Sequence, residues 1–348
     1  MRRPMVRGLS VMAALVATTA VCWGLGGREV RAQARPAAPK AGPPGIGQRV
    51  ERLGDEIMVC GQLYHTTAKV VLWTDPGGYD AYRVERRFAP IDEAAWGKGE
   101  TPNLKRPNRY TSRLRNLSRS DVERVRGGGW DLETLAGVVD QFVIHFDARG
   151  TSRRCFEILQ DVRGLSVHFM LDLDGTIYQT LDVKEAAQHA TIANGRSIGI
   201  EIANIGAYPV DEPNPLGDWY ARDADGRLRI IVPDSSASGR KDVLRPCGDK
   251  PVEGTIQGKK LRQYDFTPQQ YNALARLTAT LCTLFPKIKP DYPRDASGAL
   301  IPRKLDATEY AKYQGILGHY HVQLNKVDPG PAFQWDRYLE TTRDLMKK

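Results

Sequence analysis

Two histidines and one aspartate in this 348-residue sequence have the side chains that bind zinc in hydrolases. His145 lies in an apolar stretch, His319 follows Gly318, and Asp328 stands in a Pro-Gly turn nine residues after His319. Two imidazoles and one carboxylate around an open fourth position form a catalytic zinc site. Such a metal lowers the pKa of bound water to about 7 and polarises a carbonyl group. The three residues are therefore candidate zinc ligands.

A hydrolytic site needs two further groups. Glu201 lies in a β-prone stretch and is a candidate base for the attacking water, and Lys326 is a candidate cation for the oxyanion. Other interpretations stay open from the residues alone. His145 would also suit a buried core position, Asp328 a simple turn and Glu201 an exposed strand. The sequence spacing does not decide, because His145 and His319 lie far apart in the chain.

Regular elements must position these residues. Residues 141–147 alternate in polarity, which predicts a strand with Phe142, Ile144 and Phe146 on one face and His145 on the other. Residues 198–203 predict a second strand, with Glu201 opposite a face of isoleucines. Residues 167–171 and 176–181 predict a hairpin around Asp174-Gly175.

Helices are expected in three places. Residues 151–163 have apolar side chains at helical spacing and end at Gly164, a suitable C-cap. Residues 267–285 carry a capping box formed by Thr267 and Gln270, with a proline at the first helical position. Residues 307–314 predict another helix.

Composition limits the classes of protein. With 41% hydrophobic and 26% charged residues, the chain is not collagen-like, coiled-coil or wholly disordered. Eight basic residues between Lys105 and Arg126 suggest a docking patch for an anionic polymer or, as we favour, a solvated loop with a short helix. Four cysteines lie after residue 34 without a CxxC pair, so disulfides stay open and a zinc ribbon is not expected.

The N-terminal region predicts export. Residues 1–34 contain a basic start, an apolar run from Val11 to Leu25 and a small-x-small site at Ala32-Gln33-Ala34, which together are typical of a secretory signal peptide. A single membrane anchor is the alternative. Removal of these residues lowers the formal net charge from +9 to +5, which is too diffuse to indicate nucleic acid but suits an anionic envelope. We expect a periplasmic or extracellular protein.

Several motifs occur together, in order, between Gln141 and Trp335. They are the Val-Ile-His145 strand, Val167 to Tyr178, Gln188-His-Ala, Arg196 to Glu201, Gly318-His319, and Lys326 to Phe333. Each is weak alone. Together they resemble the zinc-dependent N-acetylmuramoyl-L-alanine amidases, a family related to the peptidoglycan-recognition proteins.

The resemblance implies a role for each matching residue. His145, His319 and Asp328 match the zinc ligands, Glu201 matches the catalytic glutamate, and Lys326 matches the lysine that stabilises the tetrahedral intermediate. These residues imply Zn²⁺ as the cofactor. A further match, His189, corresponds to a histidine in the substrate cleft that binds substrate or supports a ligand.

Two residues and one insertion call for comment beside the family pattern. Val167 stands where some relatives carry a catalytic tyrosine. His321 would lie on the same side as His319 in an extended segment, so it is an alternative ligand. We favour His319 because it follows Gly318. A polar insertion at 209–265 is longer than expected.

The implied fold is α/β, with a central mixed β-sheet flanked by helices. The expected organisation is a signal peptide at 1–34, a Pro/Ala/Gly-rich linker at 35–47, a β-containing N-terminal extension at 48–135 and a zinc amidase domain at 136–345 that contains the insertion. We expect a monomer without stable membrane insertion after cleavage and without a nucleic-acid partner.

The implied activity is hydrolysis of the amide between N-acetylmuramic acid and L-alanine, with peptidoglycan or a muropeptide as substrate. One alternative is a non-catalytic peptidoglycan-binding module. Such proteins typically lose zinc ligands, and the presence of His145, His319, Asp328 and Glu201 argues against it. Another alternative is a zinc hydrolase for a different acyl-amino acid.

Overall fold

The computed structural model describes residues 46–47, 50–83, 85–86, 88–90, 92–95, 109–233 and 242–347. The predicted signal peptide and nearly all of the predicted linker lie outside these residues. The chain divides into two units, Met1–Val50 and Glu51–Lys348, and the second contains the sheet and the candidate site. Within the described residues no helix is long and apolar enough to cross a membrane.

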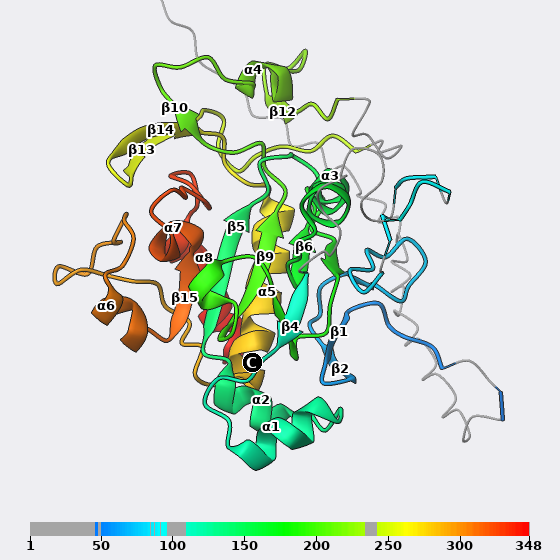
Figure 1. Cartoon of the computed structure of the whole chain (residues 1–348). Helices are drawn as coiled ribbons and strands as arrows, with labels where there is room; N and C mark the ends of the chain where they lie inside the picture. The colour runs from blue at the N-terminus through cyan, green and yellow to red at the C-terminus, as the bar shows by residue number, and fades with distance from the viewer. Residues whose placement is uncertain are drawn as a thin grey trace, which may run out of the picture. The chain divides into compact units, whose positions relative to one another are not determined.

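A six-stranded mixed sheet forms the centre of the second unit (Figure 1). Its strand order is β15-β5-β9-β6-β7-β3. The first four strands in this order are parallel to one another. Strand β7 is antiparallel to β6, and the edge strand β3 is parallel to β7. The strands are β15 (Gly315–Gly318), β5 (Gln141–Phe146), β9 (Ser197–Ile202), β6 (Phe169–Leu171), β7 (Ile177–Gln179) and β3 (Val70–Leu72).

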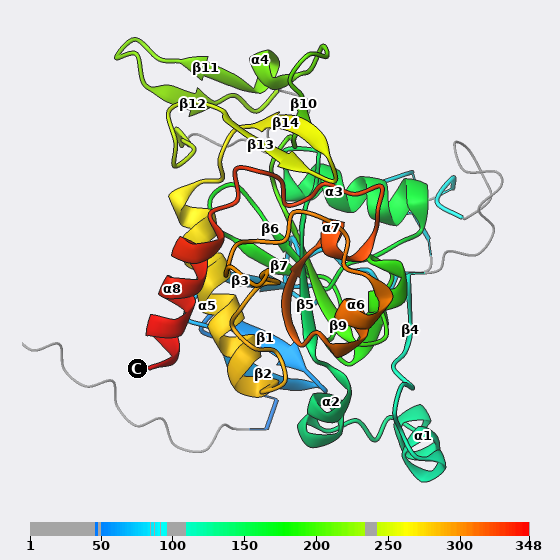
Figure 2. The same cartoon turned by 90° about the vertical axis from the view of Figure 1, so that its left-hand side faces the viewer.

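Helices cover both faces of this sheet. Helices α5 (Pro268–Leu284) and α8 (Trp335–Met346) pack on one face, where the β5 and β9 residues Phe142, Ile144 and Ile200 enter the main core. Helix α3 (Ser152–Glu157) covers the other face (Figure 2). Its Cys155 and Phe156 belong to the same buried cluster as Met170 of β6. The predicted α/β fold is therefore confirmed.

The sequence signals for the long helix are also confirmed. Thr267 caps α5 by accepting the backbone N–H of Gln270, whose side chain accepts the N–H of Thr267 in return. At the predicted 151–163 helix, α3 continues into a π-helical turn at Ile158–Arg163. That turn ends at Gly164, whose left-handed φ of 59° suits glycine.

The N-terminal extension is joined to the sheet at several places. Its hairpin of β1 (Glu56–Val59) and β2 (Gln62–His65) leads into the sheet strand β3. A further short strand, β4 (Tyr110–Ser112), pairs antiparallel with β8 (Glu185–Ala187). Helices α1 (Arg119–Arg126) and α2 (Leu132–Val138) then lead to β5. The extension therefore completes the sheet at its β3 edge.

The basic segment does not match either sequence interpretation throughout. Helix α1 is mostly exposed, as a solvated short helix would be, but Arg109 and Arg113 are buried. Lys105 and Arg106 lie outside the described residues. The two buried arginines donate to backbone carbonyls, so they neither form a docking patch nor lie in solvent.

The insertion folds into a hairpin and a small separate sheet. A hairpin strand β12 (Leu228–Ile230) pairs with β11 (Tyr220–Arg222), after the short helix α4 (Leu216–Trp219). A separate three-stranded sheet has the order β10-β14-β13. Its strands are β10 (Tyr208–Pro209), β14 (Lys259–Gln263) and β13 (Val252–Ile256).

The four cysteines of the described residues are free thiols, so the structure contains no disulfide among them.

Candidate active site

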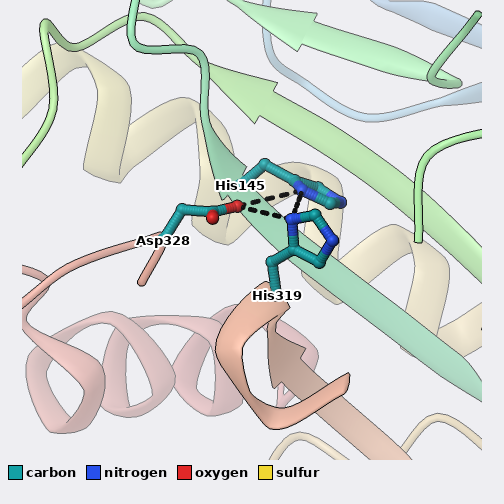
Figure 3. Close-up of side chains that lie close together, drawn as sticks. All are labelled: His145, His319 and Asp328. Carbon is teal, nitrogen blue, oxygen red and sulfur yellow. Dashed lines mark hydrogen bonds and ion pairs between the residues drawn. The ribbon is translucent and has the colours of Figure 1, made fainter. Parts of the chain in front are cut away.

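Three side chains from separate segments meet at the end of the sheet (Figure 3). His145 Nδ1 lies 2.9 Å from His319 Nδ1, and Asp328 Oδ2 lies 3.0 Å from the first nitrogen and 2.9 Å from the second. All three residues are buried. This spacing suits a group that could hold one metal ion.

Strand register brings the two histidines together. Gly318 of β15 is the register partner of Ile144 of β5, so His319 and His145 follow a matched pair on neighbouring parallel strands. Helix α7 (His319–Val322) begins at His319 itself. A Cβ at position 318 would lie 2.7 Å from Pro329, so glycine there permits the Asp328 turn to approach.

The hydrogen bonds at the outer ring nitrogens leave the inner nitrogens available. His145 Nε2 lies 2.9 Å from Nδ1 of His189, and His319 Nε2 contacts Oε1 of Gln323. If each Nε2 carries the proton and donates it to these acceptors, both Nδ1 lone pairs point at Asp328 Oδ2. Lone pairs and a carboxylate this close repel each other unless a cation lies among them, so the donor set fits a divalent metal.

Burial and local charge shift the pKa values of His145 and Asp328. Burial, together with His319 nearby, lowers the pKa of His145 to about 4. Burial disfavours an ionised Asp328, but His319 and His145 outweigh it and hold the pKa of Asp328 well below its usual range. A neutral imidazole and an ionised carboxylate are the forms in which these two side chains bind zinc.

Glu201 lies beside this group. It is the register partner of His145 across β5 and β9, and its Oε1 is 4.0 Å from His145 Nδ1. Its Oε2 is buried without a hydrogen-bond partner among the described residues. Burial raises the pKa of Glu201 well above its usual range, and Asp328 and Asp147 add to the effect. A carboxyl group with a raised pKa is a stronger base than an ordinary glutamate, which suits a role in proton transfer.

One cavity of about 200 Å³ joins most of the predicted site residues. Its lining includes Glu201, His319, Asp328, Lys326 and His189. His145 lies behind them, 1% exposed. The structure thus brings together all six predicted site residues, while their roles as ligands, base and oxyanion partner stay predictions.

His321 does not belong to this group. Its Nδ1 accepts the N–H of Gly318 at 2.9 Å, and its Nε2 donates to the carbonyl of Ile301 at 2.8 Å. The segment is helical from His319 onward, so residues two apart point in different directions and the extended-segment argument does not apply. The geometry favours His319 as the ligand candidate.

His168 is a structural residue of the fold. Its Nδ1 accepts the N–H of Gly199 at 3.1 Å, and its Nε2 lies 2.9 Å from the carbonyl of Glu185.

A second group of side chains with metal-binding atoms close together, Asp55, Glu56 and His65, lies in the N-terminal extension. Glu56 is engaged there by the backbone N–H groups of Leu53 and Gly54, so it acts as a local cap.

Two supporting residues were not predicted. Gln323 contacts the outer nitrogen of His319 through its Oε1. Side chains four residues apart meet on a helix, so a helix at this segment would have indicated Gln323 as a partner of His319. Gly199 makes room for His189, because a Cβ there would lie 2.5 Å from the imidazole. A glycine within an isoleucine-rich strand is the signal for such a close approach.

Comparison with known sequences identifies one family. A family model described as N-acetylmuramoyl-L-alanine amidase (Amidase_2) matches residues 136–331, more than half of the chain. The matched range contains all six predicted site residues. No curated protein gives a significant match to this sequence.

Similar solved structures include two amidases and the protein AmpD. The E. coli N-acetylmuramyl-L-alanine amidase AmiD, in complex with anhydro-N-acetylmuramic acid-L-Ala-D-gamma-Glu-L-Lys, is 19% identical with a TM-score of 0.34; the match covers 58% of this chain and 57% of AmiD. A selenomethionine derivative of AmpD is 16% identical with a TM-score of 0.30, covering 75% and 97%. The endolysin amidase LysCS from Clostridium intestinale is 16% identical with a TM-score of 0.30, covering 61% and 86%. The family assignment depends on the sequence match.

Proposed function

This chain belongs to the N-acetylmuramoyl-L-alanine amidase family, and we propose that it is a zinc-dependent enzyme that hydrolyses the amide between N-acetylmuramic acid and L-alanine in peptidoglycan or its fragments. One observation carries the proposal. Two imidazole nitrogens and one carboxylate oxygen lie within 3.0 Å of one another, beside the carboxyl group of Glu201, which lines the same cavity as His319 and Asp328.

We assign the metal to His145 Nδ1, His319 Nδ1 and Asp328 Oδ2. When bound, zinc would acidify a water molecule and polarise the scissile carbonyl. The outer contacts with His189 and Gln323 hold the two imidazoles in the required orientation.

Glu201 moves the proton in this proposal. Its raised pKa lets it accept a proton from the attacking water and then donate the same proton to the departing alanine nitrogen, so that the amide bond breaks to a carboxylic acid and a free amine. Lys326, which lines the same cavity, places a positive charge where the carbonyl oxygen becomes negative.

The cellular setting is part of the proposal. The features of residues 1–34 support export, and peptidoglycan lies outside the cytoplasmic membrane, so we propose a periplasmic or extracellular enzyme that acts as a monomer. The sequence alternative of a binding module is disfavoured by the retained ligand set and by Glu201 in the cavity.

The test is digestion of sacculi and of a soluble muropeptide by purified protein, with and without a zinc chelator, followed by mass spectrometry. Peptides that begin with L-alanine, lost on chelation and restored by zinc, would support the proposal. Protein that binds sacculi but releases no peptide would favour the binding module. Cleavage of other acyl-amino acids alone would favour a different amidase.

A further inference from the structure

Arg113 is a buried arginine outside the residues that the family model matches. It follows β4 in the N-terminal extension, and none of its surface is exposed. The pairing of β4 with β8 brings its side chain to the segment that leads from β8 to β9. That segment contains His189, which contacts a candidate metal ligand.

The guanidinium of Arg113 donates to three carbonyls: one before β8, one within the segment from β8 to β9, and one at the first residue of β9. Nε donates to Val183 at 3.1 Å, Nη1 to Asn194 at 3.1 Å and Nη2 to Ser197 at 2.8 Å. Arginine presents its donors in a rigid planar fork, whereas a lysine ammonium is a compact group on a flexible stem. Arg113 therefore fixes the position of Asn194 relative to the start of β9.

Asn194 transmits this constraint to His189. Its Oδ1 accepts the backbone N–H of His189 at 3.1 Å and that of Ala190 at 2.7 Å. Its Nδ2 donates to Oε1 of Gln188 at 2.9 Å. These bonds involve residues on both sides of His189, so a shift of Asn194 moves the His189 backbone.

The imidazole of His189 has little freedom to compensate. It packs on the backbone of β9 at Gly199, where a Cβ would lie 2.5 Å from the ring. Its Nε2 lies 3.3 Å from the Ser197 hydroxyl, and its Nδ1 lies 2.9 Å from His145 Nε2. The placement of the His189 backbone therefore determines whether the ring can accept the His145 proton.

From these contacts we propose that Arg113 is a positioning residue for the metal site. By holding Asn194 and Ser197 it places His189 against His145, and His189 in turn directs His145 Nδ1 towards His319 and Asp328, which would hold the metal with it. The inference depends on the zinc site of the proposed function. It makes a residue of the N-terminal extension part of the support of that site.

The first experiment measures zinc affinity directly. Metal-free wild-type protein and Arg113→Lys are titrated with zinc in competition with a chromogenic chelator, and Co²⁺ serves as a spectroscopic probe of ligand geometry. We expect Arg113→Lys to lose about tenfold in zinc affinity and to alter the visible Co²⁺ bands, as for groups that support metal ligands. The matched control is Arg109→Lys, since Arg109 is also buried but donates to the carbonyls of Ala81 and Arg83. It should bind zinc like the wild type.

The second experiment tests the route through His189. If Arg113 acts through that residue, Arg113→Lys should cause no further loss of zinc affinity in a His189→Ala background, because the two changes then remove one shared effect. Independent, fully additive losses would overturn the route. An unchanged affinity and Co²⁺ spectrum in Arg113→Lys would overturn the proposal itself.

A folding failure would not end the test. If Arg113→Lys does not fold, Asn194→Leu breaks the same connection from the other side, and wild-type zinc affinity in that variant would overturn the inference. The readouts also separate the two proposals. Failure of the wild type to bind zinc would contradict the proposed function, whereas zinc binding that is indifferent to Arg113 would contradict only this inference.

Discussion

His145 and Glu201 are register partners on the neighbouring parallel strands β5 and β9, and their side chains lie on the same face of the sheet. Their strand neighbours Ile144 and Ile200 enter the core on the opposite face. Because side chains alternate along a strand, a shift of either strand by one residue would exchange a site residue for a core residue. The hydrophobic core thus fixes the distance between the candidate ligand and the candidate base.

Glu201→Gln should abolish most of the activity without removing the metal. Glutamine keeps the shape of the side chain but cannot accept the proton, so we expect turnover of a soluble muropeptide to fall by about 10²- to 10⁴-fold. The control is Glu253→Gln. Glu253 is an exposed residue of β13 that forms an ion pair with Arg262 of β14, and it does not line the cavity. Zinc content and peptide release are measured together. Turnover within twofold of wild type would contradict the assigned role.

His319 and His321, which are two residues apart, should respond differently to alanine substitution. His319→Ala removes a candidate ligand, so stoichiometric zinc binding should be lost while the protein still folds. His321→Ala leaves the Gly318 N–H and the Ile301 carbonyl without their partner, which should lower the free energy of unfolding by roughly 1–3 kcal/mol for each group. Zinc binding should persist in that variant. Denaturant unfolding and metal analysis check both, and the reverse pattern would exchange the roles.

The stability of the metal-free protein should fall in mild acid through His168. Burial and the Arg113 charge lower the pKa of His168 to about 3, whereas the unfolded side chain titrates near 6.5. Between these values the unfolded state binds the extra proton, so the unfolding free energy contributed by His168 is present above pH 6.5 and decreases as the pH falls towards 3. The limiting slope is about 1.4 kcal/mol per pH unit.

His168→Gln isolates this contribution, because the amide can accept from Gly199 and donate to Glu185 without titrating. Urea unfolding of both proteins at pH 7, 6 and 5 gives the comparison. The wild type should lose more stability than the variant over this range. Parallel pH profiles would show that His168 is not held neutral in the fold.

Much of the fold follows from local patterns. The alternation in β5 and β9 and the capping box of α5 each act within a few residues, so the sequence predicts them well. The strands β13 and β14 escaped prediction because most of their side chains are exposed and polar. Their pairing depends on backbone hydrogen bonds, which leave no hydrophobic periodicity.

The site was only partly accessible to the same reasoning. The matching residues could be assigned because several short motifs occur in a family's order, not because their spacing reveals a shared location. Arg113 illustrates the limit, since a basic segment predicts solvent exposure. Its three carbonyl partners lie 70 to 84 residues away. Burial of such an arginine depends on long-range contacts, which a local pattern does not encode.

Gly199→Ala should weaken the metal site without touching a ligand. The added Cβ would lie 2.5 Å from the His189 imidazole, so the ring must move away from the contact that it makes with His145. We expect zinc affinity to fall by about 10- to 100-fold, the usual cost of disturbing a group that supports a ligand. The matched control is Gly195→Ala, because nothing lies within 4 Å of a Cβ at that position. Chelator competition measures both variants, and their thermal unfolding is compared. Equal zinc affinities at equal stability would mean that His189 does not orient His145.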